Sequence, residues 1–216
     1  MNMKKNKIKT IKNSLIDSVK NVASRIRLFA VDPEKDFTRC RKLPPETLIT
    51  LILSMGGGSL ANELLDHFKC KLNTPSPSAF VQQRAKIKSD AFEELFRIFT
   101  QSAHSKRLWN GYRVIAADGS EICFSADESD VASYYPVKNN QKSYNLLHLN
   151  AIYDLCENIY LDAVVQKLHN KNEHEAFVTM VDRHSDDVPA IFICDRGFES
   201  YIVIPFKNRN SIIGQI

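Results

Sequence analysis

The sequence predicts a mixed α/β protein, with helices in its N-terminal half and a sheet in its C-terminal half. Apolar residues recur at helical spacing as far as about residue 105. From Tyr112 onward, short apolar runs replace that spacing, as expected of buried strands. Two of these runs end in an aspartate, Asp118 and Asp195. We therefore predict a helical domain over residues 1–105 and an α/β domain over residues 112–216.

The N-terminal helices follow from apolar periodicity and from residues that cap or break helices. Three glycines at 56–58 end the second helix, Ser59 is suited to cap the third, and Ser76 or Ser78 is suited to cap the fourth. The first helical stretch is basic and amphipathic. The five predicted segments are residues 8–29, 44–55, 60–68, 79–87 and 90–105.

Charge is distributed unevenly along the chain. Residues 1–117 carry 21 lysines and arginines against 10 aspartates and glutamates, a net charge of +11. Residues 118–216 carry 8 against 15, a net charge of −7. Basic side chains that neutralise phosphates release condensed counterions, so the basic half is a candidate binder of DNA. The alternative is a solvated, lysine-rich tail on a protein of another kind.

Amide and basic side chains cluster around the fourth predicted helix. Such groups match base edges and phosphates, so the cluster is a candidate DNA-reading element. The connection 69–75 is longer than a tight helix-turn-helix turn, and a plain solvated surface is the alternative interpretation. The predicted DNA-contacting residues of this cluster are Gln82, Gln83, Arg84, Lys86 and Lys88.

The C-terminal half reads as short strands with one helix between them. Three strands in a meander, a crossover helix and a parallel strand form the opening of a ribonuclease-H-like fold. In that order the first and last strands are neighbours, which would bring Asp118 and Asp195 together. We place a turn at Gly119-Ser120, between the first two strand segments. The predicted strand segments are 112–118, 121–125, 146–155, 159–167 and 190–194, and the predicted helix is 172–184.

Two carboxylates at the tips of adjacent strands suit a site for divalent metal ions. They could flank two Mg²⁺ ions roughly 3.5–4 Å apart and support in-line phosphoryl transfer. Mg²⁺ is commonly held by only one or two carboxylates together with substrate phosphates. The alternatives are that Asp118 caps the turn before Gly119 and that Asp195 pairs with Arg196. Zinc-protease and serine-nucleophile motifs are absent from the sequence.

Composition indicates a soluble globular protein. The 216 residues are 44% hydrophobic, which is enough for a sizeable core. The five cysteines include no C-x-x-C pair, so neither a zinc site nor a disulfide framework is indicated. Without a signal-peptide core or a run of 18 apolar residues, we expect a cytoplasmic protein that does not bind membranes.

Several ordered motifs carry a resemblance to a known family. They are Ala-Asp-Gly-Ser at 117–120, Tyr-Asn-Leu-Leu-His-Leu-Asn-Ala-Ile-Tyr-Asp-Leu at 144–155 and Cys-Asp-Arg-Gly-Phe-Glu-Ser-Tyr at 194–201. The upstream segments 43–45 and 78–84 fit the same pattern. Together, from about residue 37 to residue 201, they resemble DDE transposases of the bacterial insertion-sequence-four family.

This resemblance implies an N-terminal DNA-binding domain and a ribonuclease-H-like core that cleaves and transfers DNA strands at transposon ends. Asp118 and Asp195 match the family's first and second acids and would bind Mg²⁺ or Mn²⁺ in a two-metal site. Arg196 joins the predicted DNA-contacting residues. The expected partner is double-stranded DNA, specifically transposon terminal repeats. The resemblance allows a homodimer on that DNA, and no small-molecule substrate is expected.

The family's third acid has no counterpart in this chain. It is a glutamate in a Y-R-E-x-x-x-x-K helix, and that motif does not occur in the sequence. The resemblance therefore implies a C-terminally truncated and defective transposase. Two alternatives stay open: a non-catalytic DNA-binding remnant that inhibits an intact transposase, and an unrelated metal-dependent nuclease of the same fold.

Overall fold

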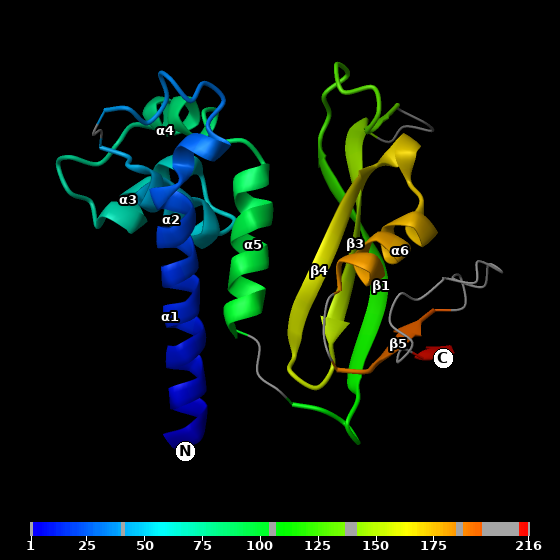
Figure 1. Ribbon diagram of the computed structural model, residues 1–216. Coiled ribbons are helices and arrows are strands. Elements are labelled where there is room, and N and C mark those ends of the chain that lie inside the picture. The colour runs from blue at the N-terminus through cyan, green and yellow to red at the C-terminus, as the bar shows by residue number, and fades with distance from the viewer. Residues whose placement is uncertain are drawn as a thin grey trace. The chain divides into compact units, whose positions relative to one another are not determined.

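The computed structural model describes residues 2–39, 42–103, 107–136, 142–184, 188–195 and 212–215 (Figure 1). The chain divides into two compact units, Met1–Ala103 and His104–Ile216. The first is helical and the second holds a mixed sheet, so the predicted α/β class is confirmed. No helix in the described part of the chain is long and apolar enough to cross a membrane.

The first unit is built from helices that begin at sequence-encoded caps. Ser59 Oγ accepts the Asn62 N–H and Ser76 Oγ accepts the Ala79 N–H, so Ser76 rather than Ser78 caps the fourth α-helix. The helices are α1 (Asn2–Ser24), η1 (Ile26–Phe29), α2 (Pro45–Ser54), α3 (Leu60–Phe68), α4 (Pro77–Arg84) and α5 (Asp90–Ala103).

Several helix boundaries differ from the sequence prediction, and two helices end three or more residues before the predicted end. The first stretch, predicted to run to Phe29, ends as an α-helix at Ser24 and continues as the short 3₁₀ helix η1. The helix predicted over 79–87 ends at Arg84 because the next residues pair with a distant segment. Val31 N–H donates to the Lys86 carbonyl and Lys88 N–H donates to the Phe29 carbonyl, which forms a β-bridge in place of another helical turn.

Two apolar clusters hold the first unit together. In the first, α1 packs against α2 and α5, and in the second, α2, α3 and α4 pack around Phe80. The buried members are Val19, Val22, Ile26, Ile49, Ala91 and Leu95 in the first cluster, and Leu43, Leu48, Leu51, Leu64 and Phe80 in the second.

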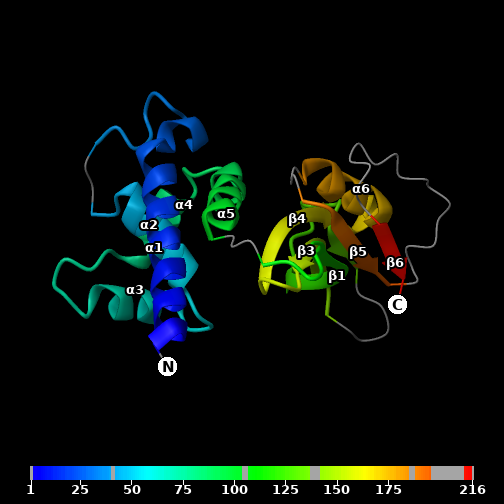
Figure 2. The same cartoon turned by 60° about the horizontal axis from the view of Figure 1, so that its bottom comes forward.

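The second unit is a six-stranded mixed sheet with one long helix on one face (Figure 2). Its strand order is β2-β3-β1-β5-β6, and β4 also pairs with β3. The β1 strand is antiparallel to β3 and parallel to β5. The elements are β1 (Arg113–Ser125), β2 (Tyr134–Tyr135), β3 (Tyr144–Asp154), β4 (Ile159–Lys167), η2 (Leu168–Asn170), α6 (Glu173–Arg183), β5 (Ala190–Cys194) and β6 (Ile212–Gln215).

The turn predicted at Gly119-Ser120 is wrong. A single strand, β1, runs through both residues, and its pairing with β3 continues from Ile115 to Ser125 without interruption. The strands predicted at 159–167 and 190–194 are confirmed with the same bounds. The helix between them, α6, connects β4 to β5, and β5 lies beside β1 as predicted.

The core of the second unit lies between α6 and one face of the sheet. Because side chains alternate along a strand, only every second residue of β1, β3 and β5 faces this core. Phe177 and Phe192 meet edge to face at its centre, with ring centroids 5.8 Å apart. The buried members are Ile115, Ala117, Ile152, Phe177, Met180, Ala190, Phe192 and Cys194.

Candidate functional site

Asp118 and Asp195 lie side by side at one end of the parallel pair β1 and β5. Ala117 and Cys194 are the last paired positions of the two strands, and each aspartate is the next residue. Neighbouring strands lie about 4.8 Å apart, so the two backbones are adjacent here. Both aspartates are solvent-exposed.

The two aspartates also share one face of the sheet. Ala117 and Cys194 are buried beneath α6, and alternation along the strands turns the following residues to the opposite face. Two strands thus bring two carboxylates together at the point where the parallel β1–β5 pairing ends. That arrangement is able to hold one hard divalent cation between them.

Asp118 does not cap a turn, which was the alternative interpretation of this residue. Its Oδ1 accepts the Gly119 N–H at 2.8 Å within an extended strand. The alternative for Asp195, an ion pair with Arg196, falls on a residue outside those that the structure describes, as does the predicted DNA contact of Arg196.

Gly119 is required by close packing on its own side of the sheet. A Cβ atom at this position would lie 2.7 Å from His148 Nε2 and 3.5 Å from Asn150 Oδ1, both on β3. Contacts under 3.0 Å force a neighbour to move, and the His148 ring is 3% exposed and enclosed by the fold. The glycine beside Asp118 therefore lets β3 pack a histidine directly behind the aspartate pair.

Partly buried polar contacts link β3 and β4 to the start of α6. His148 Nε2 lies 3.1 Å from Glu173 Oε1, which is ion-pair distance, although neither ring nitrogen forms a hydrogen bond with a described residue. Asn150 Nδ2 donates to Gln166 Oε1 at 3.2 Å. Gln166 in turn exchanges hydrogen bonds with the backbone of Asn172, the N-cap of α6. These contacts fix α6 to β3 and β4 behind Asp118.

The sequence contains a signal for these polar contacts. His148 and Asn150 alternate with apolar residues in β3, at positions that share the α6-facing side with Ile152. Two polar residues on the buried face of a strand indicate a specific polar partner, because such groups are rarely buried alone. The partner, Glu173, is distant in sequence and becomes visible only in the fold.

A complete three-ligand metal site is not found in the part of the chain that the structure describes. No group of three histidine, cysteine, aspartate or glutamate side chains in those residues is placed to hold a metal ion. Asp118 and Asp195 would supply two carboxylates, a set that fits Mg²⁺ or Mn²⁺ only when water and substrate oxygens complete the coordination.

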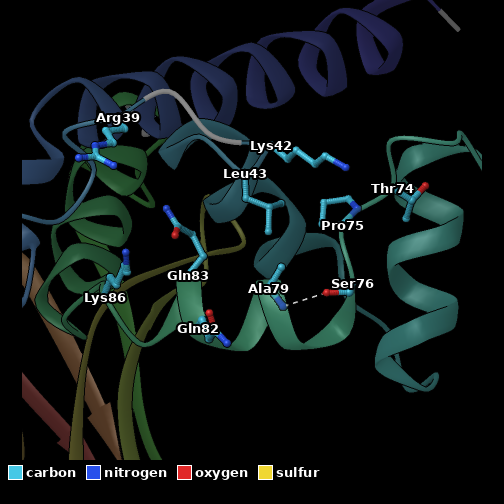
Figure 3. A pocket seen from close by; sticks show the side chains of 10 residues that line it. All are labelled: Arg39, Lys42, Leu43, Thr74, Pro75, Ser76, Ala79, Gln82, Gln83 and Lys86. Atoms are coloured by element: carbon cyan, nitrogen blue, oxygen red, sulfur yellow. Dashed lines mark hydrogen bonds between the residues drawn. The ribbon is translucent and has the colours of Figure 1, made fainter.

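The five predicted DNA-contacting residues near α4 do not share one exposed helix face. Gln82 and Arg84 are exposed on α4, whereas Gln83 is only 6% exposed. Lys86 and Lys88 follow the helix in the bridge to the segment after η1. Gln82, Gln83 and Lys86 instead line a cavity of about 840 Å³, together with Arg39 and Lys42 from the segment before α2 (Figure 3).

Comparison of the chain with protein-family models, curated proteins and solved structures gives no match. The resemblance to DDE transposases therefore depends on the motifs of the chain itself. The features that bear on function are the aspartate pair, the charge distribution and the cavity beside α4.

Proposed function

We propose that this chain is a DNA transposase of the insertion-sequence type, with Asp118 and Asp195 as ligands of Mg²⁺ or Mn²⁺. The observation that carries the proposal is the β1–β5 register, whose last pair, Ala117 and Cys194, directly precedes the two aspartates on neighbouring strands. Rigid strands hold carboxylates in fixed geometry, as metal-assisted phosphoryl transfer requires. The motifs around both residues support the same function.

The residues of the chain would contribute position and charge to the reaction. A divalent metal held there would activate the attacking oxygen and neutralise charge that develops on the phosphodiester. Asp118, within β1, and Asp195, directly after β5, would orient that site. The backbone at Gly119 packs closely against the side chains of His148 and Asn150. This close packing limits movement of the β1 backbone at Asp118.

The basic half of the chain supports DNA as the substrate. Residues 1–117 carry a net charge of +11, whereas residues 118–216 carry −7. Lys and Arg side chains on the first unit would neutralise DNA phosphates, while the acidic second unit concentrates divalent cations rather than phosphate. This division assigns binding mainly to the first unit and chemistry to the second.

A second candidate is a DNA-binding protein that performs no catalysis and occupies transposon ends against an intact enzyme. The favouring observation is that the described residues contribute two carboxylates to the site and no third ligand. Both candidates require DNA binding, and only the first requires DNA strand cleavage.

Metal titration and nicking of duplex DNA by the full chain separate the two candidates. We expect Mn²⁺ to bind the parent protein and either Asp118→Asn or Asp195→Asn to weaken that binding by more than about tenfold. Asp182→Asn is the matched control, because Asp182 is an exposed aspartate on α6. Equal loss in the control, or no Mn²⁺ binding at all, contradicts a metal site at the pair.

Nicking that needs both aspartates supports the transposase, and DNA binding without nicking supports the second candidate.

A further inference from the structure

The cavity beside α4 has the size of a small-molecule site and a strongly cationic wall. It is an open cavity of about 840 Å³, lined by the segments before α2 and α4, by α4 itself and by Lys86 after α4 (Figure 3). Ligand pockets in proteins typically have roughly 300–1,000 Å³. Among the described residues that line it, Arg39, Lys42 and Lys86 are basic and none is acidic. An anion is therefore the favoured type of ligand.

A second, smaller cavity overlaps the first at Arg39, Gln83 and Lys86. Its volume is about 350 Å³, and Glu34 and Lys35 also line it. Arg39 forms no ion pair with a described residue, so its guanidinium remains available to a ligand. Lys86 Nζ lies 3.4 Å from Asp36 Oδ1, which holds the ammonium group at the edge of the cavities.

Gln83 is the most informative residue of the wall. Gln83 is 6% exposed and lines both cavities, and its backbone carbonyl accepts the Lys86 N–H, whereas its side-chain amide has no hydrogen bond to a residue that the structure describes. Its neighbour Gln82, by contrast, donates to Ser78 Oγ. In Figure 3 the Gln83 amide extends from α4 toward the side where Arg39 and Leu43 lie. Because this amide opens into both cavities, it is placed to donate a hydrogen bond to a ligand there.

We propose that this cavity binds a phosphorylated nucleoside. Its phosphate would contact Arg39, Gln83 and Lys86, where the two cavities overlap. The larger cavity has further volume with an apolar wall of Leu43, Pro75 and Ala79, which suits a sugar and a base. The nucleoside is either a free nucleotide or the phosphorylated end of a DNA strand, and only the second source rests on the proposed DNA-binding function.

Titration of the full chain with deoxyadenosine 5′-monophosphate, followed by calorimetry or by NMR shifts, tests the proposal. We expect saturable binding that is lost with deoxyadenosine, and we expect Arg39→Gln to weaken it about tenfold by removing one charge-assisted contact. Arg27→Gln is the matched control, because Arg27 is also exposed in the first unit and lines neither cavity. The control is expected to leave the affinity within about twofold of the parent value.

A second variant and a second ligand complete the test. Gln83→Glu puts a negative charge at the phosphate position and is expected to abolish binding. The second ligand is a 5′-phosphorylated single-stranded oligonucleotide. If it binds more tightly than the free nucleotide and with the same dependence on Arg39, the ligand is the phosphorylated strand end. Equal affinity of the two ligands identifies the free nucleotide. Absence of saturable binding to both ligands, or equal weakening by Arg27→Gln, overturns the proposal. Duplex binding that persists in that case leaves the proposed function standing.

Discussion

Gly119 shows how one residue beside the candidate site is constrained by packing. A methyl group there would meet the buried His148 ring, whose Nε2 would lie 2.7 Å from the new Cβ. We expect Gly119→Ala to lower the free energy of unfolding by about 1–3 kcal/mol, as overpacking does in other cores. Chemical denaturation monitored by circular dichroism measures the change.

Gly57→Ala is the control for that prediction, because no atom lies within 4 Å of a Cβ built at Gly57. The double variant Gly119→Ala with His148→Ala should lose less stability than the two single changes added together, since the clash is removed with the ring. Strict additivity of the two changes would contradict a direct contact.

Cys194, directly before Asp195, is expected to be chemically inert. Burial raises the pKa of its thiol to about 11, so the thiolate that reacts with alkylating agents is scarce at neutral pH. In the native protein at pH 8, iodoacetamide should label the exposed Cys70 and Cys123 well before Cys194. Mass spectrometry of peptides taken over time measures the order, and early labelling of Cys194 would show that the end of β5 is open.

At the scale of elements, a buried ion pair ties the beginning of β1 to the end of β3. The Arg113 guanidinium donates to Asp154 Oδ2, and both side chains are almost fully buried. Asp154 Oδ1 also accepts the N–H groups of Cys156 and Glu157, which shapes the turn into β4. One carboxylate thus aligns three strands of the sheet that carries Asp118.

Removal of that carboxylate should destabilise the second unit strongly. Asp154→Ala removes one carboxylate from the buried Arg113 guanidinium, and we expect a loss of about 3–5 kcal/mol in the free energy of unfolding. Asp182→Asn, an exposed change in the same unit, should alter stability by less than about 0.5 kcal/mol. Similar losses in the two variants, measured by urea denaturation, would contradict this role of Asp154.

Local sequence signals predicted most elements, and non-local contacts explain the misses. The Ser59 and Ser76 caps and the apolar run 190–194 act within a few residues, so the sequence alone reveals them. Glycine often marks a turn, so the sequence predicts one at Gly119. The reason for a glycine here is instead the close approach of His148 on β3. The α4 boundary was missed because Lys86 and Lys88 pair with residues near η1. For the candidate site, the sequence predicts that β1 and β5 are adjacent strands. It does not predict the contact between His148 and Glu173.

At the scale of the whole molecule, the two units differ in composition and in charge. The helical unit belongs to the basic half of the chain and the sheet unit belongs mostly to the acidic half. If the chain binds duplex DNA as proposed, affinity must depend steeply on salt, because each phosphate that is neutralised releases counterions.

We expect the logarithm of the association constant for duplex DNA to fall linearly with the logarithm of salt concentration, with a slope of about −0.9 per phosphate contacted. Replacement of exposed Arg84 or Lys88 by glutamine should make the slope shallower by about 1. Arg183→Gln, in the acidic half, is the control and should leave the slope unchanged. Fluorescence anisotropy at several salt concentrations measures the slopes, and a flat salt dependence would contradict DNA binding by phosphate contacts.

The central claim is that Asp118 and Asp195 together hold a divalent metal ion. Anomalous diffraction from crystals of the full chain grown with Mn²⁺ tests it most directly. The account predicts an anomalous peak about 2.1–2.2 Å from a carboxylate oxygen of each aspartate, absent in Asp118→Asn crystals. Crystals that show Mn²⁺ only at other carboxylates, or no peak at this end of β1 and β5, would contradict the claim.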